Sequence, residues 1–222
     1  MKKIISIILL LFLIVIFVTC QSAGDKNRSS FAITPAGKIE LWNGKDFTGW
    51  KRFVADSSVD VDTVWVVRDG VIRCNGNPSG YLRTLQDYEN YKLTLEWRWP
   101  GAGGNSGVLM HMSEPDVVWP RSIEAQLFSG NAGDIWVIGG TEIAEHVDKT
   151  TRRVQKQGES SEKPLGDWNV YQIICRGDSI KIYVNNVLQN VGSQASIQSG
   201  KICLQSEGTP IEFCNIVLQP LP

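Results

Sequence analysis

The stretch YKLTLEWRWPGAGGNSGVLMHM, residues 91–112, decides the fold class. Residues 91–99 alternate strictly between apolar and polar side chains, and residues 106–112 form a second extended run. A period of two is typical of β-strands that bury one face. The glycine- and proline-rich segment between the runs predicts a bend that joins two strands.

The same pattern continues through the chain. Short alternating or β-branched runs are separated by dipeptides that tolerate positive φ, such as Asp69-Gly70 and Asn185-Asn186. Helical periodicity is almost absent, so the sequence predicts an all-β antiparallel sandwich or barrel. The other predicted strands are TVWVV (63–67), GVIRC (70–74), SIEAQLF (122–128), WNVYQIICR (168–176), SIKIYV (179–184), GKICLQ (200–205) and PIEFCNIVL (210–218).

The first 19 residues have the features of an export signal. Lys2 and Lys3 precede an apolar run from Ile4 to Val18, which only Ser6 interrupts. Cys20 follows where a bacterial lipoprotein carries its lipidated cysteine, although its neighbours are larger than usual. We expect an exported lipoprotein, anchored at Cys20 and facing the periplasm or the cell surface, with a conventional cleaved signal as the alternative. The run is short for a membrane-spanning anchor.

The segment from residue 20 to residue 36 is polar and rich in small side chains, which predicts a flexible tether. Residues 37–222 then remain as one β-sandwich domain, long enough for a sizeable core. Without residues 1–19 the chain has 20 basic and 23 acidic residues, a net charge of −3. Because no basic patch stands out, we expect no nucleic-acid partner.

Four further cysteines occur, namely Cys74, Cys175, Cys203 and Cys214. Their spacing is typical neither of a disulfide framework nor of a zinc site. A hairpin turn at residues 208–210 would place Cys203 opposite Cys214, and we favour two separate thiols there over a bridge.

Polar side chains gather on one face of three predicted strands. Alternation places Glu96 and Arg98 together, and it places Glu124 and Gln126 together. His111 is expected on the same face of its strand as Leu109, opposite the two methionines. A sheet with one solvent-exposed face would account for these polar groups. Glu96 and Arg98 would then be an exposed ion pair that contributes little to stability.

Two features favour a binding cleft instead. The residue types are those that perform acid–base chemistry and bind sugars. Trp119 and Trp136 also lie near polar, glycine-rich turns. Rings of this kind stack on the C–H face of a sugar while carboxylates and amides bond its hydroxyls. We therefore expect a carbohydrate partner. The charged segment of residues 142–166, which contains His146 and Arg152, is either a functional loop or an ordinary solvated one.

Several motifs, taken in order, resemble the bacterial 3-keto-disaccharide hydrolase domain family, and the resemblance covers nearly all of residues 38–220. It implies a concanavalin A-like jelly-roll sandwich of two curved antiparallel sheets, with the site on the concave sheet. His111 and Cys214 depart from the family, which often has arginine at both positions, so activity and sugar preference stay open. The motifs are LWNGKDFTGW, YENYKLTLEWRW followed by GGNSGV, SIEAQLFSGNAGDIW, DWNVYQIICRGDSIKIYVNNVLQN and GKICLQSEGTPIEFCNI.

The resemblance implies cleavage of glycosides already oxidised at C3. The ketone acidifies the C2 proton, a base removes it, the group on C1 leaves by β-elimination, and water adds back. This chemistry needs a base, donors to an enolate oxygen and an acid for the leaving group. The candidates are Glu124 as base, His111 or Glu96 as acid, Arg98 as enolate donor, Asn105 and Gln126 for hydroxyls, and Trp119 and Trp136 as further binding residues.

Two other functions stay open. An ordinary glycoside hydrolase needs two carboxylates, ~5–5.5 Å apart for retention or ~6.5–9.5 Å apart for inversion. Related glucanases carry E-x-D-x-E on one strand, whereas Gln126 and Phe128 replace the last two acids here, so Glu96 would have to be the second carboxylate. A non-catalytic carbohydrate-binding module would leave Glu124 exposed and distant from the other candidates.

No cofactor is expected to be required. GAGGNSG lies between strands rather than before a helix, so it does not have the context of a phosphate-binding loop. His111 and His146 lack the spacing of a zinc site. A structural calcium ion is compatible with the fold, but the spacing of Asp134 and Asp148 does not indicate one.

Overall fold

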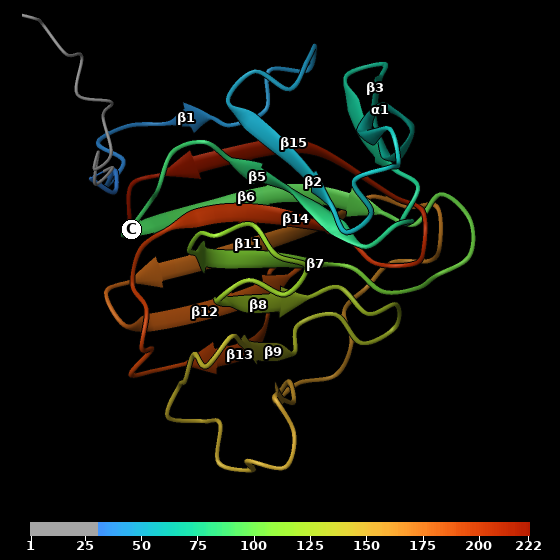
Figure 1. The fold of residues 1–222 in the computed structure, drawn as a ribbon. Helices are drawn as coiled ribbons and strands as arrows, with labels where there is room; N and C mark the ends of the chain where they lie inside the picture. The colour runs from blue at the N-terminus through green and yellow to red at the C-terminus, as the bar shows by residue number, and fades with distance from the viewer. Residues whose placement is uncertain (1–30) are drawn as a thin grey trace, which may run out of the picture.

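The computed structural model describes residues 31–222, which form two β-sheets packed against each other (Figure 1). The strands are β1 (Ile39–Glu40), β2 (Trp50–Val54), β3 (Trp65–Arg68), β4 (Val71–Cys74), β5 (Gly80–Thr84), β6 (Tyr91–Arg98), β7 (Gly107–Met112), β8 (Ser122–Gln126), β9 (Ile135–Ile138), β10 (Arg153–Val154), β11 (Asn169–Arg176), β12 (Ser179–Val184), β13 (Val187–Gly192), β14 (Lys201–Ser206) and β15 (Ile211–Gln219).

The two sheets have a jelly-roll arrangement, as expected. The eight-stranded sheet has the order β13-β12-β11-β6-β15-β4-β3, with β1 paired to β15. The seven-stranded sheet has the order β10-β9-β8-β7-β14-β5-β2. The named strands pair antiparallel throughout, for example β6 with β11 and β7 with β8.

The core lies between the sheets and follows from side-chain alternation. In β6, Tyr91, Leu93, Leu95 and Trp97 are fully buried, whereas the residues between them are partly exposed. Each large apolar side chain buried in this way contributes about 1.5–3 kcal/mol of transfer free energy. The alternation that predicted this strand therefore also fixes which of its faces packs against the seven-stranded sheet.

The chain crosses between sheets after β14, where the sequence predicted a hairpin. Strand β14 belongs to the seven-stranded sheet and β15 to the eight-stranded one, so Cys203 and Cys214 lie in different sheets. The hairpin prediction is wrong, and the preference for separate thiols is confirmed. Cys74, Cys175, Cys203 and Cys214 are all free thiols.

The predicted strand of residues 63–67 begins later than expected. Val61–Val64 form one helical turn, α1, whose N-cap Asp60 accepts a hydrogen bond from the backbone N–H of Asp62 at 2.9 Å. An aspartate at this position satisfies a helix N–H that would otherwise lack a partner. Strand β3 starts only at Trp65.

Ordered contacts begin before residue 37. The backbone N–H of Ile33 donates to Asp87 at 2.9 Å, and that of Glu89 donates to Ile33 at 3.1 Å. Ile33 therefore packs along the sandwich although the sequence assigned it to the tether. The predicted export signal and Cys20 lie outside the described residues. Within residues 31–222, no helix is long and apolar enough to cross a membrane.

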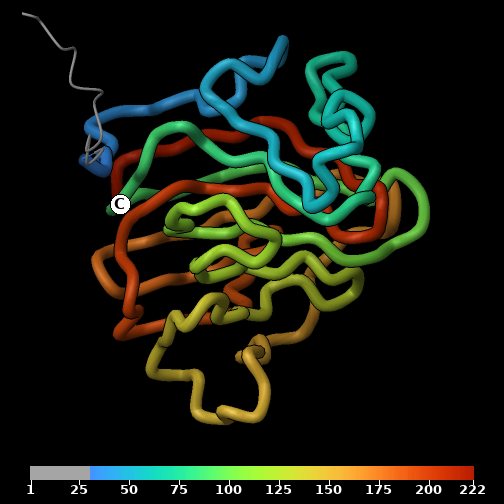
Figure 2. The backbone as a smooth tube through the Cα atoms, viewed as in Figure 1, coloured from blue at the N-terminus to red at the C-terminus, as the bar shows by residue number. Residues whose placement is uncertain are grey.

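The segment of residues 142–166 extends from one end of the sandwich and returns to it (Figure 2). It contains β10, which pairs with β9 and sets Arg153 opposite Trp136. Its pairing holds Arg152 and Arg153 at the edge of the seven-stranded sheet.

Candidate active site

The outer face of the seven-stranded sheet carries a small polar pocket of about 150 Å³. Strand β8 supplies its centre, because Ile123 and Ala125 face the core while Glu124 and Gln126 face outward. The lining residues are Asn105, Trp119, Glu124, Gln126, Trp136, Ile138, Arg152 and Glu207.

Gly107 makes room for the central carboxyl group. In β7, Gly107 lies opposite Gln126 and next to the side chains of Glu124 and Gln205. A methyl group at this position would overlap Oε1 of Glu124 and lie 2.9 Å from Oε1 of Gln205. The missing side chain therefore lets two polar side chains from the flanking strands converge over β7.

A chain of hydrogen bonds fixes one wall of the pocket. Nε1 of Trp136 donates to Oε1 of Gln126 at 2.8 Å, and Nε2 of Gln126 donates to Oδ1 of Asn105 at 3.2 Å. The guanidinium carbon of Arg152 lies 5.8 Å from the centroid of the Trp136 ring. These contacts orient an indole ring, two amides and a cation around the carboxyl group of Glu124.

Both carboxyl groups in the pocket have a raised pKa. Burial raises the pKa of Glu124 well above its usual value, and the nearby charge of Glu207 raises it further. Burial also raises the pKa of Glu207 to about 7, against the opposing effects of Asn105 and Arg152. Titratable groups shifted in this way and gathered in a pocket are typical of acid–base sites.

Several buried polar atoms on Glu124, which lines the pocket, and on Gln205, which lies beside Gly107, lack a partner. Oε1 of Glu124 and both side-chain polar atoms of Gln205 are buried and make no hydrogen bond with residues 31–222. Buried polar groups normally have partners, and leaving one unsatisfied costs about 1–3 kcal/mol. A ligand with its own hydroxyl or carbonyl group would supply the partner that Glu124 lacks in the pocket.

The segment of residues 113–121 folds over part of the same sheet face. Oδ1 of Asp116 accepts hydrogen bonds from the hydroxyl of Tyr81 at 2.9 Å and from Nε of Arg83 at 2.7 Å. Its other oxygen accepts one from Nζ of Lys51 at 2.7 Å. These bonds anchor the segment, and the half-exposed ring of Trp119 lies at the rim of the pocket.

A larger chamber of about 480 Å³ adjoins the pocket and shares Asn105, Gln126 and Trp136 with it. Phe128 and Arg153 extend the chamber away from the carboxyl groups. Together the two hollows form a binding region with acids at one end and an aromatic ring at the other. No group of three or more His, Cys, Asp or Glu side chains in residues 31–222 is arranged to hold a metal ion.

The structure places Glu96 and Arg98 away from this pocket. Both belong to β6 in the eight-stranded sheet, where Oε1 of Glu96 accepts from Nδ2 of Asn215 at 2.9 Å and Nε of Arg98 donates to Glu212 at 2.6 Å. The prediction that they share one site with Glu124 is wrong. Alternation assigned their face correctly but could not tell which sheet the strand joins.

His111 also lies outside the pocket. It has a φ of +57° at an irregularity in the pairing of β7 with β14, and its fully buried ring packs edge-on against Tyr91 at 5.8 Å. Burial lowers the pKa of His111 to about 4, so the ring is uncharged near neutral pH. The irregularity puts Met112 on the same face as Leu109, and the expected placement of His111 on that face is wrong.

Two charged residues that line the pocket, Glu207 and Arg152, were not among the sequence candidates. Glu207 directly follows β14, and continued alternation from Cys203 through Gln205 would have placed it on the outer face. Arg152 lies in the long charged segment, where composition alone does not separate it from its neighbours. Glu124, Gln126, Asn105, Trp119 and Trp136 do lie together, as the sequence predicted.

Comparisons with known proteins identify the family of this chain and its fold. The sequence profile of the 3-keto-alpha-glucoside-1,2-lyase-like domain matches residues 37–219. A 3-keto-disaccharide hydrolase of Bacteroides thetaiotaomicron is 28% identical over 94 residues, which span 39% of this chain and 31% of the relative. That match therefore covers about a third of the relative's length.

Solved structures share the fold. A candidate glycosyl hydrolase of Parabacteroides distasonis ATCC 8503 superposes with a TM-score of 0.63 at 24% identity, over 84% of this chain and 94% of that one. A Bacillus licheniformis beta-glucanase gives 0.54 at 16% identity, over 84% and 99%. These likenesses show the concanavalin A-like sandwich. Because the profile covers most of the sequence, the chain carries a carbohydrate-active, hydrolase-like domain and belongs to the 3-keto-alpha-glucoside-1,2-lyase-like domain family.

Proposed function

We propose that this protein cleaves glycosides whose sugar carries a ketone at C3, and that the polar pocket on the seven-stranded sheet is its active site. The observation that carries the proposal is the pair of carboxyl groups, Glu124 and Glu207, which share one small pocket and both have a raised pKa. Two tryptophans and two amides around them suit a sugar ring.

The reaction begins at C2 of the oxidised sugar. The C2–H bond breaks, the proton passes to a carboxylate, and the electron pair spreads onto the C3 oxygen as an enolate. The enolate then expels the group on C1, whose oxygen takes the bonding pair and a proton from an acid. Water adds to C1 of the resulting enone and C2 regains a proton, which leaves a 3-keto sugar and a free alcohol.

The different pKa shifts of the two carboxyl groups support different roles for them in the proposed reaction. A base is most effective when its pKa is near the working pH, which fits Glu207 with its pKa of about 7. Burial raises the pKa of Glu124 well above its usual value, so it suits the acid that protonates the leaving oxygen. We therefore place Glu207 at the base position that the sequence had given to Glu124.

Arg152 takes the position that the sequence had given to Arg98. It lines the pocket, and its positive charge lowers the pKa of both carboxyl groups. A guanidinium group in this place would stabilise negative charge that develops on the C3 oxygen. Gln126 and Asn105, held by Trp136, are placed to bond sugar hydroxyls.

An ordinary glycoside hydrolase remains the second candidate. Two carboxyl groups in one pocket are what such an enzyme needs, and Glu207 supplies the partner that Glu96 cannot. A non-catalytic sugar-binding module is less favoured, because Glu124 is only 4% exposed where such a module would leave it open to solvent. Glu124 lies far from Glu96, Arg98 and His111, which would by itself favour a binding module. The case for an enzyme therefore rests on Glu207, the second carboxyl group in the pocket.

Paired substrates test the proposal. Glycosides and their 3-keto counterparts are incubated with the purified protein and with Glu124→Gln and Glu207→Gln, using the exposed Glu159→Gln as control. We expect turnover confined to the keto sugars and lost in the first two variants only. Cleavage of unoxidised glycosides would contradict the proposal and support an ordinary glycoside hydrolase. Binding without turnover would contradict it and support a non-catalytic binding module.

We also propose that the protein is exported and anchored through a lipid on Cys20. The apolar run of residues 4–18 and the cysteine that follows it support this. Metabolic labelling with palmitate should mark the wild type and not Cys20→Ser. Equal labelling of the two would contradict the anchor.

A further inference from the structure

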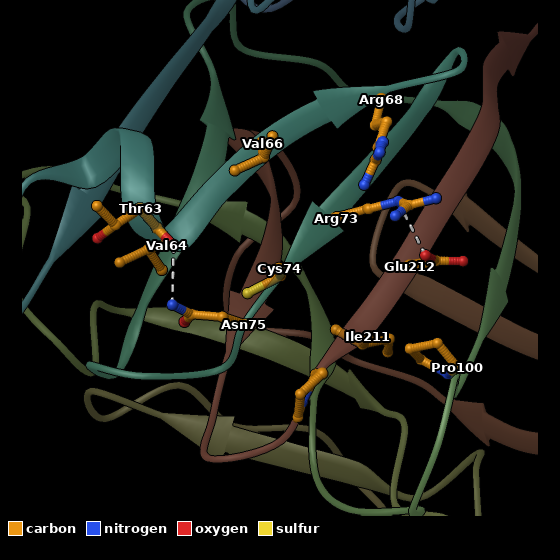
Figure 3. Close-up of a pocket in the computed structure, with 11 residues that line it drawn as sticks. Thr63, Val64, Val66, Arg68, Arg73, Cys74, Asn75, Pro100, Ile211 and Glu212 are labelled. Atoms are coloured by element: carbon orange, nitrogen blue, oxygen red, sulfur yellow. Dashed lines mark hydrogen bonds and ion pairs between the residues drawn. The ribbon is translucent and has the colours of Figure 1, made fainter.

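A second cavity, of about 390 Å³, lies at the end of the eight-stranded sheet where β3, β4 and β15 pair (Figure 3). Its lining combines apolar side chains, among them Val66, Pro100 and Pro210, with two arginines, Arg68 and Arg73. Val66 is 42% exposed, so the apolar wall is open to solvent and to a ligand.

The strand register explains the charge of this cavity. Val66, Arg73, Glu212 and Arg98 stand opposite one another in a row across β3, β4, β15 and β6. Glu212 is only 5% exposed, and its two oxygens pair with Nε of Arg73 at 3.1 Å and with Nε of Arg98 at 2.6 Å. One carboxylate therefore serves two guanidinium groups.

Arg68 is a third arginine near the carboxylate of Glu212, and it lines the same cavity. It lies two residues from Val66 in β3, and Figure 3 shows its side chain pointing toward the guanidinium group of Arg73. Arg68 makes no hydrogen bond or ion pair in the described part of the chain. Arg68 pairs with Val71, so its side chain lies diagonal to Arg73 on the same face of the sheet. Glu212 is already shared by Arg73 and Arg98, so Arg68 is left as a cation that an anion between Arg68 and Arg73 would neutralise.

We propose that this cavity binds a small organic anion, a carboxylate with an apolar body. The carboxylate lies between Arg68 and Arg73, whose planar guanidinium groups match its two oxygens. The apolar body packs against Val66, Pro100 and Pro210. Charge complementarity selects the head group, and the apolar wall excludes a bare inorganic ion as the preferred ligand.

The anion site contacts the same two segments of chain as the candidate active site. Pro100 and Asn105 belong to one connection, and Glu207 and Pro210 to another, with one residue of each connection lining each cavity. The connections are packed together, since a methyl group on Gly104 would overlap the side chain of Thr209. The binding proposal does not depend on the proposed reaction.

Nuclear magnetic resonance titration of the full folded protein tests the proposal. Benzoate is added to the wild type, to Arg68→Gln and to Arg121→Gln, an exposed arginine outside the cavity, while amide shifts are followed. We expect shifts around Val66, Arg73 and Ile211, with Kd about tenfold weaker in Arg68→Gln and unchanged in the control.

Two further probes separate the head group from the body. Benzyl alcohol keeps the ring without the charge, and acetate keeps the charge without the ring. Each should bind more weakly than benzoate. The proposal is overturned if benzoate shifts none of these amides, if Arg68→Gln binds it as well as the wild type does, or if benzyl alcohol binds equally well.

Discussion

Glu207→Gln should make the protein more stable at alkaline pH. The carboxyl group has a pKa of about 7 in the folded protein against an ordinary value of 4.5. Each unit of such a shift corresponds to about 1.4 kcal/mol. The difference between 4.5 and about 7 therefore amounts to about 3.5 kcal/mol at most, and we expect about 2 kcal/mol because solvent reaches part of the side chain.

The sign of the effect follows from the proton count. Below pH 4.5 the group is protonated in both the folded and the unfolded chain, so it does not change stability. Between pH 4.5 and about 7 the unfolded chain releases the proton while the folded protein keeps it, and the free energy of unfolding falls as pH rises. Above about pH 7 the full cost is present, and glutamine removes it.

Urea unfolding of the wild type and of Glu207→Gln at pH 5 and at pH 8 measures this difference. The variant should gain little at pH 5 and about 2 kcal/mol at pH 8. Glu159→Gln, on an exposed glutamate, should change stability equally at both pH values. A Glu207→Gln variant that is no more stable than the wild type at pH 8 would refute the claim that burial of the ionised Glu207 carboxylate destabilises the folded protein.

Two further predictions concern the geometry and charge of the pocket. Gly107→Ala puts a methyl group 2.8 Å from the carboxyl carbon of Glu124, so we expect about a hundredfold loss of kcat with an unchanged circular dichroism spectrum. Gly101→Ala, which has nothing within 4 Å, is the matched control and should be as active as the wild type. Arg152→Gln removes a charge that lowers the pKa of Glu207, so the acid limb of the pH–rate profile should move to higher pH. An acid limb that stays in place would remove Arg152 from the electrostatics of the site.

Alternation within single strands was the most reliable guide to the site. It placed Glu124 and Gln126 outward because the neighbouring Ile123 and Ala125 had to be buried. The same alternation, continued past β14, also contained Glu207. Which face of a strand a side chain occupies depends on the residues next to it in the sequence, so it can be predicted from one strand alone.

What the sequence did not contain was the pairing between distant strands. Glu96 and Arg98 have the right residue types but lie on the other sheet, because β6 pairs with β11 and β15. His111 turns inward at a single irregularity in the strand pairing, which also moves Met112 to the face opposite the one that alternation predicts. Neither feature has a strong signal in one sequence, so the candidate site was only partly predicted.

The most direct test of the central claim is the fate of the C2 hydrogen. A 3-keto glycoside is cleaved in deuterium oxide, and the sugar product is examined for deuterium at C2, with the product alone in deuterium oxide as the control for spontaneous exchange. If the proton on Glu207 exchanges with solvent before C2 regains one, elimination predicts deuterium at C2 of the product, formed faster than in the control. A product that keeps its original C2 hydrogen would contradict the elimination and would favour ordinary glycoside hydrolysis in the same pocket.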